Sequence, residues 1–188
     1  DGVPVGKDVV LVDNSDTQNT KAEGTWTRST AVSGYQGIDY QYKGPGTGDH
    51  SFTWTLNIPR DGDYTVYVKY TQGGSRASNA PYTIEHAEGT TTKRVNQKEN
   101  GGQWVEIGTY PFRADRTWTI TLTDDADGNV IADAVKLVRD NSGETDNEEK
   151  QFEYTYDANG NLIEMTDGSS GAEIDTYQMA YTELNQIQ

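Results

Sequence analysis

The side chains best suited to ligand chemistry in this chain are aromatic rings beside glycine turns. Trp104 follows the Gly101-Gly102 pair, and Tyr35 lies between Gly34 and Gly37. A flat aromatic ring can cover a patch of C–H bonds on a ligand such as a sugar, and this contact requires no charge. These rings are therefore the first candidates for a binding surface.

The orientation of Trp104 depends on the register of the segment WVEIG. If Val105 and Ile107 point inward, Trp104 and Glu106 point outward, unless a bulge beside the two glycines resets the alternation. An outward indole is either a stacking platform or a structural lid over a neighbouring hairpin. The sequence leaves these two interpretations open.

The segment TWTRSTAVSGYQGIDYQY supplies a second group of aromatic residues in a loop rich in Gly and Ser and in the strand after it. Loops on a rigid scaffold often carry binding residues. The two-residue spacing of Tyr40 and Tyr42 favours packing on one face of a sheet. Tyr35 is predicted to be exposed, and Trp26 is a further candidate anchor.

Polar candidates follow the Gly73-Gly74 turn. Arg76 and Asn79 could give bidentate hydrogen bonds to neighbouring hydroxyl groups, or to a carboxylate on an acidic ligand. In the alternative interpretation, Arg76 pairs with a local acid and Asn79 caps the turn before Pro81. Turn chemistry favours this local role.

The turn DDADGN places Asp124, Asp125 and Asp127 close together, and these hard oxygen ligands make Ca²⁺ a possible cofactor. The segment is not an EF-hand, because the twelfth position counted from Thr123 is Ala134 rather than Glu. Asp133 falls on the same side of its predicted strand as the neighbouring apolar residues, so we expect its carboxylate to point inward. A buried carboxylate must be hydrogen-bonded, paired with a cation or bound to a metal, and we expect a structural role.

Signs of catalysis are absent from the sequence. The chain has two histidines and no cysteine, and it contains no nucleophile elbow, zinc-ligand spacing or phosphate-binding loop. Because the chain contains many acidic residues, the presence of any one pair is no evidence for a catalytic pair of carboxylates. We therefore predict that the protein is not an enzyme and requires no cofactor.

The elements that must position these residues are strands. Alternating apolar residues in 50–58, 63–70 and 117–123 predict strands with one buried face. Further strands are expected at 8–13, 38–43, 82–87, 91–97, 104–112 and 130–138. Short strands between Gly, Pro and Asp turns predict an all-β fold, an antiparallel β-sandwich over residues 8–139, with no long helix.

The composition changes after the sandwich. Residues 140–150 hold five acidic residues and one lysine, which predicts a solvated linker. Residues 151–188 repeat weakly, since Tyr154–Leu162 aligns with Met179–Ile187. We expect β-hairpin units here, with part of the segment poorly ordered unless it packs on a neighbour.

Charge limits the class of partner. The net charge is −15, which argues against nucleic acid and anionic membrane surfaces. No apolar run is long enough for membrane insertion, and no signal peptide is recognised at Asp1. The start DGVPVGKD looks like a fragment cut from something larger. The absence of cysteine leaves the cellular compartment open.

Two families resemble parts of the chain. VVLVDNSD, GTWTRSTAVSGYQGIDYQY, the long segment DGDYTVYVKY through GTYPF, and VIADAVKLV resemble the golvesin and xanthan-lyase type of carbohydrate-binding-like domain. The resemblance implies a jelly-roll-like sandwich attached to secreted enzymes or surface proteins. YTYDANGNL resembles the YD repeat of the Rhs family of secreted or surface proteins, although Met179 and Thr182 depart from that pattern in the second copy.

Together these features predict a non-catalytic carbohydrate-binding module of a secreted or cell-surface protein with Rhs-type repeats. The polysaccharide or cell-surface glycan would contact Trp104, Tyr35 and Trp26, with hydrogen bonds from Arg76 and Asn79. The alternative is a structural or adhesive spacer that projects the remaining Rhs repeats of the parent chain and has every aromatic residue committed to packing.

Overall fold

The structure is a computed structural model that describes residues 8–141 together with two backbone strands, 152–156 and 162–167. The chain divides into two compact units, residues 1–141 and 142–188. In the described residues all regular structure is β, and no helix there is long and apolar enough to cross a membrane.

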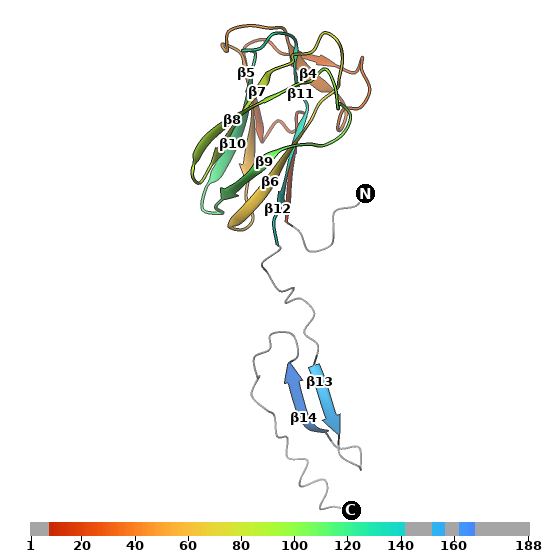
Figure 1. The fold of residues 1–188 in the computed structure, drawn as a ribbon, viewed down its shortest axis with the longest axis vertical. Helices are drawn as coiled ribbons and strands as arrows, with labels where there is room; N and C mark the ends of the chain where they lie inside the picture. The colour runs from red at the N-terminus through yellow and green to blue at the C-terminus, as the bar shows by residue number, and fades with distance from the viewer. Residues whose placement is uncertain (1–7, 142–151, 157–161, 168–188) are drawn as a thin grey trace, which may run out of the picture. The chain divides into compact units, whose positions relative to one another are not determined.

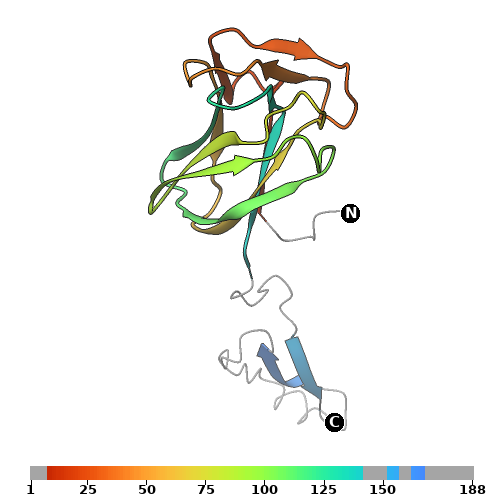
Figure 2. The same ribbon diagram turned by 45° about the horizontal axis from the view of Figure 1, so that its top comes forward.

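The first unit is built from two large antiparallel sheets and one small sheet, which Figures 1 and 2 show from two directions. The four-stranded sheet has the order β1 (Val9–Asp13), β12 (Ala134–Arg139), β6 (Gly62–Lys69), β9 (Val105–Phe112). The five-stranded sheet has the order β2 (Thr20–Glu23), β5 (Ser51–Asn57), β10 (Thr117–Thr123), β7 (Ala80–His86), β8 (Gly89–Val95). The small sheet has the order β11 (Val130–Ala132), β4 (Tyr40–Lys43), β3 (Thr27–Ser29).

The core lies between the two large sheets, and every second residue of the central strands enters it. In β5, Phe52, Trp54 and Leu56 are at most 1% exposed, as the alternation predicts. The matching residues of the other central strands are Tyr64, Val66 and Val68 in β6, Trp118, Ile120 and Leu122 in β10, and Val135 and Leu137 in β12. Each large side chain buried in this way contributes about 1.5–3 kcal/mol of hydrophobic stabilisation.

The path of the chain confirms the jelly-roll-like sandwich. β5 and β6 are consecutive in sequence, yet they lie in different sheets. β1, the first strand of the domain in sequence, pairs with β12, the last one. The chain therefore passes repeatedly between the layers. Figure 1 places β4 and β11 at the end of the sandwich opposite the end where β12 finishes.

Two details differ from the predicted strands. The single strand expected at 130–138 is divided at Asp133, because β11 joins the small sheet with β4 while β12 joins the four-stranded sheet. β2 and β3 were not predicted, since their sequences TKAE and TRS are short, polar and mostly exposed. A strand without a buried face leaves no alternating apolar pattern in the sequence.

The second unit contains the β-hairpin expected in this part of the chain. β13 (Phe152–Tyr156) pairs antiparallel with β14 (Leu162–Asp167), and the register shifts between Thr155 and Tyr156. The predicted linker beyond Asn141, the turn of the first repeat copy and the second copy at 179–187 lie outside the described residues.

Candidate functional site

Trp104 follows a tight turn that is fixed to the end of β6. The Gly102 N–H donates to the Tyr70 carbonyl at 2.8 Å, and the Gly101 N–H donates to the Gln72 side-chain oxygen at 3.0 Å. Gly102 has a φ of 75°, in the region that glycine adopts without steric cost. These contacts set the position of the indole relative to the four-stranded sheet.

The register of β9 places Trp104 on the outer side of this sheet, as predicted. Ile107 is 7% exposed, whereas Glu106 is exposed. The pair β6–β9 does contain an irregularity, but it lies opposite Val66 and Tyr67, inside the strands rather than beside the glycine turn. The alternation of inward and outward side chains is therefore unbroken from Trp104 to Ile107. The Trp104 side chain is half-buried.

Two lysines from neighbouring strands lie over the indole ring. The Nζ atom of Lys69 in β6 is 5.5 Å from the ring centroid of Trp104, and the Nζ atom of Lys136 in β12 is 4.6 Å from it. Lys136 also lies 5.1 Å from the ring centroid of Tyr67. Cation–π attraction therefore holds both ammonium groups over the outer face of the sheet.

The loop before β4 reaches the same place. Gly34, with a φ of 101°, lies so close to the Trp104 turn that a Cβ on it would be 2.9 Å from the Gly102 Cα atom. Gln36 in this loop accepts a hydrogen bond from Lys69 Nζ at 3.1 Å through its side-chain oxygen. Together, Trp104, Tyr67, Lys69, Lys136 and Gln36 form a surface that we call the Trp104 face.

A buried carboxylate lies next to the Trp104 face. Asp133 has no exposed surface, and it accepts a hydrogen bond from the Gln36 N–H at 2.9 Å. Burial raises the pKa of Asp133 to about 8, and the nearby carboxylates of Asp13 and Asp39 contribute in the same direction, against the attraction of Lys69. Its inward position and hydrogen bonding agree with the structural role expected from the sequence.

The other two candidate rings make more packing contacts than the sequence analysis implied. Tyr35 is half-buried, and its ring centroid lies 6.0 Å from that of Tyr40. Trp26 packs edge-on against Phe52 at 5.7 Å and donates its indole N–H to the Glu23 carbonyl at 3.2 Å. Tyr35 shares its loop with Gln36 and lies near the Trp104 turn, whereas no contact joins Trp26 to the Trp104 face.

Arg76 and Asn79 both make local contacts, but Arg76 pairs with no described acid and Asn79 bonds to Asp127 rather than capping the turn before Pro81. Arg76 is 9% exposed, and its guanidinium donates to the Thr71 carbonyl at 3.3 Å and the Tyr40 hydroxyl at 3.4 Å. The side-chain oxygen of Asn79 accepts a hydrogen bond from the Asp127 N–H at 2.9 Å. Both side chains are therefore engaged in holding loops together, and no described contact joins either of them directly to the Trp104 face.

The three carboxylates predicted as Ca²⁺ ligands have different partners in the protein. The pairs are Asp124 with the Gly48 N–H at 2.9 Å, Asp125 with the Arg94 guanidinium at 3.0 Å, and Asp127 with the Ser78 N–H at 2.7 Å. Within residues 8–141 the structure gathers no group of three acidic or histidine side chains suited to a metal ion. Calcium binding at this turn stays a prediction without support from these contacts.

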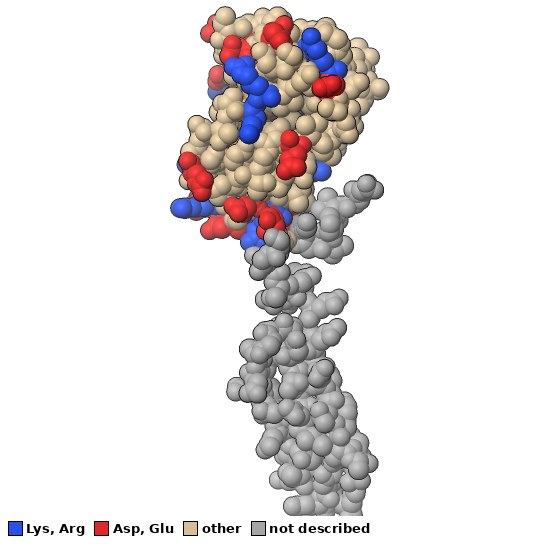
Figure 3. All heavy atoms as spheres, viewed as in Figure 1, with Lys and Arg blue, Asp and Glu red and all other residues tan. Residues whose placement is uncertain are grey.

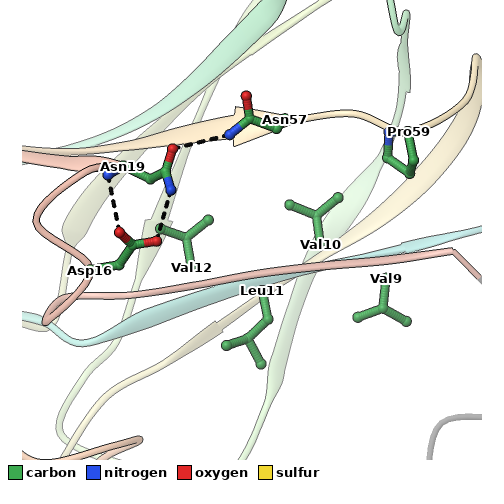
Figure 4. A pocket seen from close by; sticks show the side chains of 8 residues that line it. All are labelled: Val9, Val10, Leu11, Val12, Asp16, Asn19, Asn57 and Pro59. Atoms are coloured by element: carbon green, nitrogen blue, oxygen red, sulfur yellow. Dashed lines mark hydrogen bonds between the residues drawn. The ribbon is translucent and has the colours of Figure 1, made fainter.

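A groove of about 300 Å³ lies between β1 and the end of β5 (Figure 4). Val10 and Val12 point into it from β1, while Leu11 points to the opposite side of the strand. The Asn57 side chain donates to Asn19 at 3.0 Å across its upper edge. The lining is mostly aliphatic and amide groups and contains no aromatic ring, so this groove lacks an aromatic stacking platform.

A second groove, of about 420 Å³, lies between the edge strands β8 and β9. Lys93 and Arg94 lie along one side, and Ile107 lies on the other. The Arg94 guanidinium is already paired with Asp125 at 3.0 Å. This groove also contains no aromatic ring, so the Trp104 face remains the arrangement best suited to a planar ligand surface.

Tyr67, Lys69, Lys136 and Gln36 were not among the predicted site residues. The alternation of DYTVYVKY does place Tyr67 and Lys69 on its polar face, and Lys136 interrupts an apolar run in the same way. Strand alternation therefore shows which residues point outward. The strand order that brings β12, β6 and β9 side by side is not contained in that local pattern.

The sandwich has the fold of a known class of sugar-binding domains. A family 35 carbohydrate binding module from an environmental isolate superposes with a TM-score of 0.50 and 22% identity, over 68% of this chain and 90% of that chain. At this level of identity the likeness concerns the fold alone.

The particular family follows from the sequence. Residues 10–139 match the Golvesin C-terminal domain, and the chain belongs to this family. A xanthan lyase of Bacillus sp. (strain GL1) is 37% identical over 134 residues, which are 69% of this chain and 14% of that protein. The structure of a Paenibacillus xanthan lyase matches with a TM-score of 0.67 and 42% identity, over 70% of this chain and 13% of that chain. The chain thus corresponds to a small part of these relatives, and the expected golvesin-like resemblance is confirmed.

Proposed function

We propose that residues 8–139 form a non-catalytic carbohydrate-binding module and that the Trp104 face contacts the sugar. The observation that carries this proposal is the outward indole of Trp104, which is fixed by its turn and bordered by the hydrogen-bonding groups of Lys69, Lys136 and Gln36. An aromatic ring beside polar donors fits a sugar, which has both C–H faces and hydroxyl groups.

Each member of the Trp104 face has a distinct role in this proposal. The free part of the Trp104 ring stacks on a pyranose, and Tyr67 extends the aromatic surface toward β12. Lys69, Lys136 and Gln36 supply hydrogen bonds at its border. Tyr35 lies on the adjoining loop and is available for a secondary contact, whereas Arg76, Asn79 and Trp26 stabilise the scaffold.

The family and the fold support this assignment. The homologous segment lies within xanthan lyases, enzymes named for a polysaccharide, and the sandwich has the fold of a carbohydrate binding module. The YD-like repeat after the sandwich supports a parent protein of the Rhs type that is secreted or exposed at the cell surface.

A spacer without sugar binding is the second candidate, and one observation favours it. The lysine ammonium groups cover part of the Trp104 ring, and Tyr35 and Trp26 pack against other rings. In a spacer, Trp104 would serve only to cover the end of β6 and the start of β12. The two candidates differ in whether the removal of this ring changes any binding property.

Affinity electrophoresis in gels that contain soluble polysaccharides tests the proposal. We expect at least one neutral or acidic polysaccharide to retard the wild-type protein, and Trp104→Ala to weaken this binding about tenfold or more, because the stacking surface is lost. Trp26→Ala is the matched control, since it removes another half-buried indole that lies away from the Trp104 face.

Thermal melts of both variants establish that they remain folded. Retardation that survives in Trp104→Ala and disappears in folded Trp26→Ala would contradict the assignment of the site. If no polysaccharide retards the wild-type protein, the spacer is the better account.

A further inference from the structure

We propose that the Trp104 face selects sugars that carry a negative charge, such as a carboxylate or a sulfate ester. This inference rests on the proposed carbohydrate-binding function and specifies the class of ligand. It is based on the two lysines over the ring, which place two positive charges beside one stacking platform.

These two lysines lack an ionic partner among the described residues. Neither Lys69 nor Lys136 forms an ion pair with a residue that the structure describes, although five other ion pairs are present there. Figure 3 shows basic groups interspersed with acidic ones on the face that it displays. In a chain with a net charge of −15, two neighbouring cations without a carboxylate partner are an unusual arrangement.

The acidic residues nearest to the Trp104 face do not neutralise it. Glu106 is exposed and lies opposite Tyr67 in the register, but it pairs with neither lysine. Asp13 accepts hydrogen bonds from Ser15. Because burial raises the pKa of Asp133 to about 8, this group is mostly uncharged at neutral pH.

The two ammonium groups also repel each other. Partial burial lowers the pKa of Lys136, and the charge of Lys69 lowers it further. An anion placed between the two cations would relieve this repulsion. No described carboxylate forms an ion pair with either lysine, so the site is electrostatically complementary to a negatively charged ligand.

The lysines retain hydrogen-bond donors for such a ligand. An ammonium group has three donors. Lys69 uses one donor on Gln36 at 3.1 Å, and Lys136 donates no hydrogen bond to a described residue. The cation–π contacts hold both groups over the Trp104 ring, so less conformational entropy is lost when a carboxylate or sulfate oxygen accepts from them.

Matched pairs of oligosaccharides test the inference by isothermal titration calorimetry with the whole chain. The first pair is tetragalacturonate and its methyl ester, and the second is sulfated and unsulfated cellotetraose. We expect the charged member of at least one pair to bind about tenfold or more tightly than its neutral partner. The pair that shows the preference identifies carboxylate or sulfate as the favoured group.

Lys69→Gln and Lys136→Gln remove one charge each and keep most of the side-chain length. Each change should weaken binding of the charged ligand about three- to tenfold, as expected for one partly exposed charge-assisted contact. The double variant should bind both members of the pair about equally. Lys93→Gln is the charge-matched control, because Lys93 is exposed on β8 in the other sheet.

The outcomes separate this inference from the function on which it rests. If charged and neutral members bind equally and Trp104→Ala weakens both, the carbohydrate-binding function stands and the charge preference is wrong. A charge preference that persists in the folded double variant also overturns the inference. If no member of either pair binds, the charge preference is wrong, whereas the carbohydrate-binding function fails only if no polysaccharide retards the wild-type protein in affinity electrophoresis.

Discussion

The outer faces of the two large sheets carry different side chains on the same alternating backbone. On the five-stranded sheet, the outward residues of β5 and β10 include Thr53, Thr55, Thr119 and Thr121. The hydroxyl oxygens of Thr53 and Thr121 lie 3.3 Å apart across the strands. The centre of this face is uncharged, and charged side chains at its margins are paired with each other, as Lys21 is with Glu23. Its small β-branched side chains favour the strand conformation.

On the four-stranded sheet, the outward residues include Tyr67, Lys69 and Lys136, with Trp104 at the start of β9. A loop from outside the sheet adds Gln36 at its border. The same alternation of inward and outward side chains therefore produces the outer faces of both sheets. The larger aromatic and cationic side chains, together with the adjoining loops, turn one of these faces into a candidate binding surface.

The largest expected effect comes from a substitution that pushes the loop containing Gly34 away from the Trp104 turn. Gly34→Ala adds a Cβ 2.9 Å from the Gly102 Cα atom at a φ of 101°. The close contact with backbone and the strained φ should together lower the free energy of unfolding by about 2–3 kcal/mol and weaken sugar binding. Urea denaturation measures the first effect, and calorimetry with the charged oligosaccharide that binds the wild-type protein measures the second.

Gly89→Ala isolates the contribution of the backbone in that experiment. Gly89 also has a positive φ, 126°, but a Cβ there meets nothing within 4 Å. We expect a loss of about 1 kcal/mol with sugar binding unchanged. Equal losses in the two variants, with binding preserved in both, would show that the contact of Gly34 with the turn is not required.

A smaller effect, dependent on pH, should come from the buried acid beside the Trp104 face. The pKa of Asp133 is about 8 in the folded protein, above its ordinary value, so the folded state retains a proton that the unfolded chain releases. Stability contributed by this group therefore falls as the pH rises from about 4 to about 8 and is constant above that range.

Asp133→Asn keeps an oxygen that can accept from the Gln36 N–H, and it removes the charge. The melting temperature of this variant relative to wild type should rise across the interval from pH 4 to pH 8. Melts at closely spaced pH values provide the test. A difference between the two proteins that does not change with pH would show that Asp133 titrates at an ordinary pKa.

The sequence was sufficient for the sandwich and for the outward position of Trp104, but not for the other residues of the Trp104 face. Period-two patterns identified the core of β5, β6 and β10 because these strands have one buried side. The same patterns correctly placed Trp104 opposite to Ile107. Polar edge strands such as β2 and β3 escaped detection because burial imposes no pattern on them.

The remaining site residues depend on contacts between distant segments. Lys69 and Lys136 are 67 positions apart in the sequence, and only the pairing of β12 with β6 brings them to one indole. Arg76 was a reasonable ligand candidate by residue type, but its burial against Tyr40 and Thr71 became visible only in three dimensions. A local sequence pattern specifies neither the order of the strands in a sheet nor the packing of the loops.

Fluorine NMR of the protein labelled with 5-fluorotryptophan tests the central claim most directly. The four tryptophan signals can be assigned with single Trp→Phe variants. During titration with the charged oligosaccharide that binds most tightly in calorimetry, the Trp104 signal should move and saturate. The signals of Trp54 and Trp118, which are 0% and 4% exposed, should remain in place. A saturating shift at Trp26 with a stationary Trp104 signal would contradict the account.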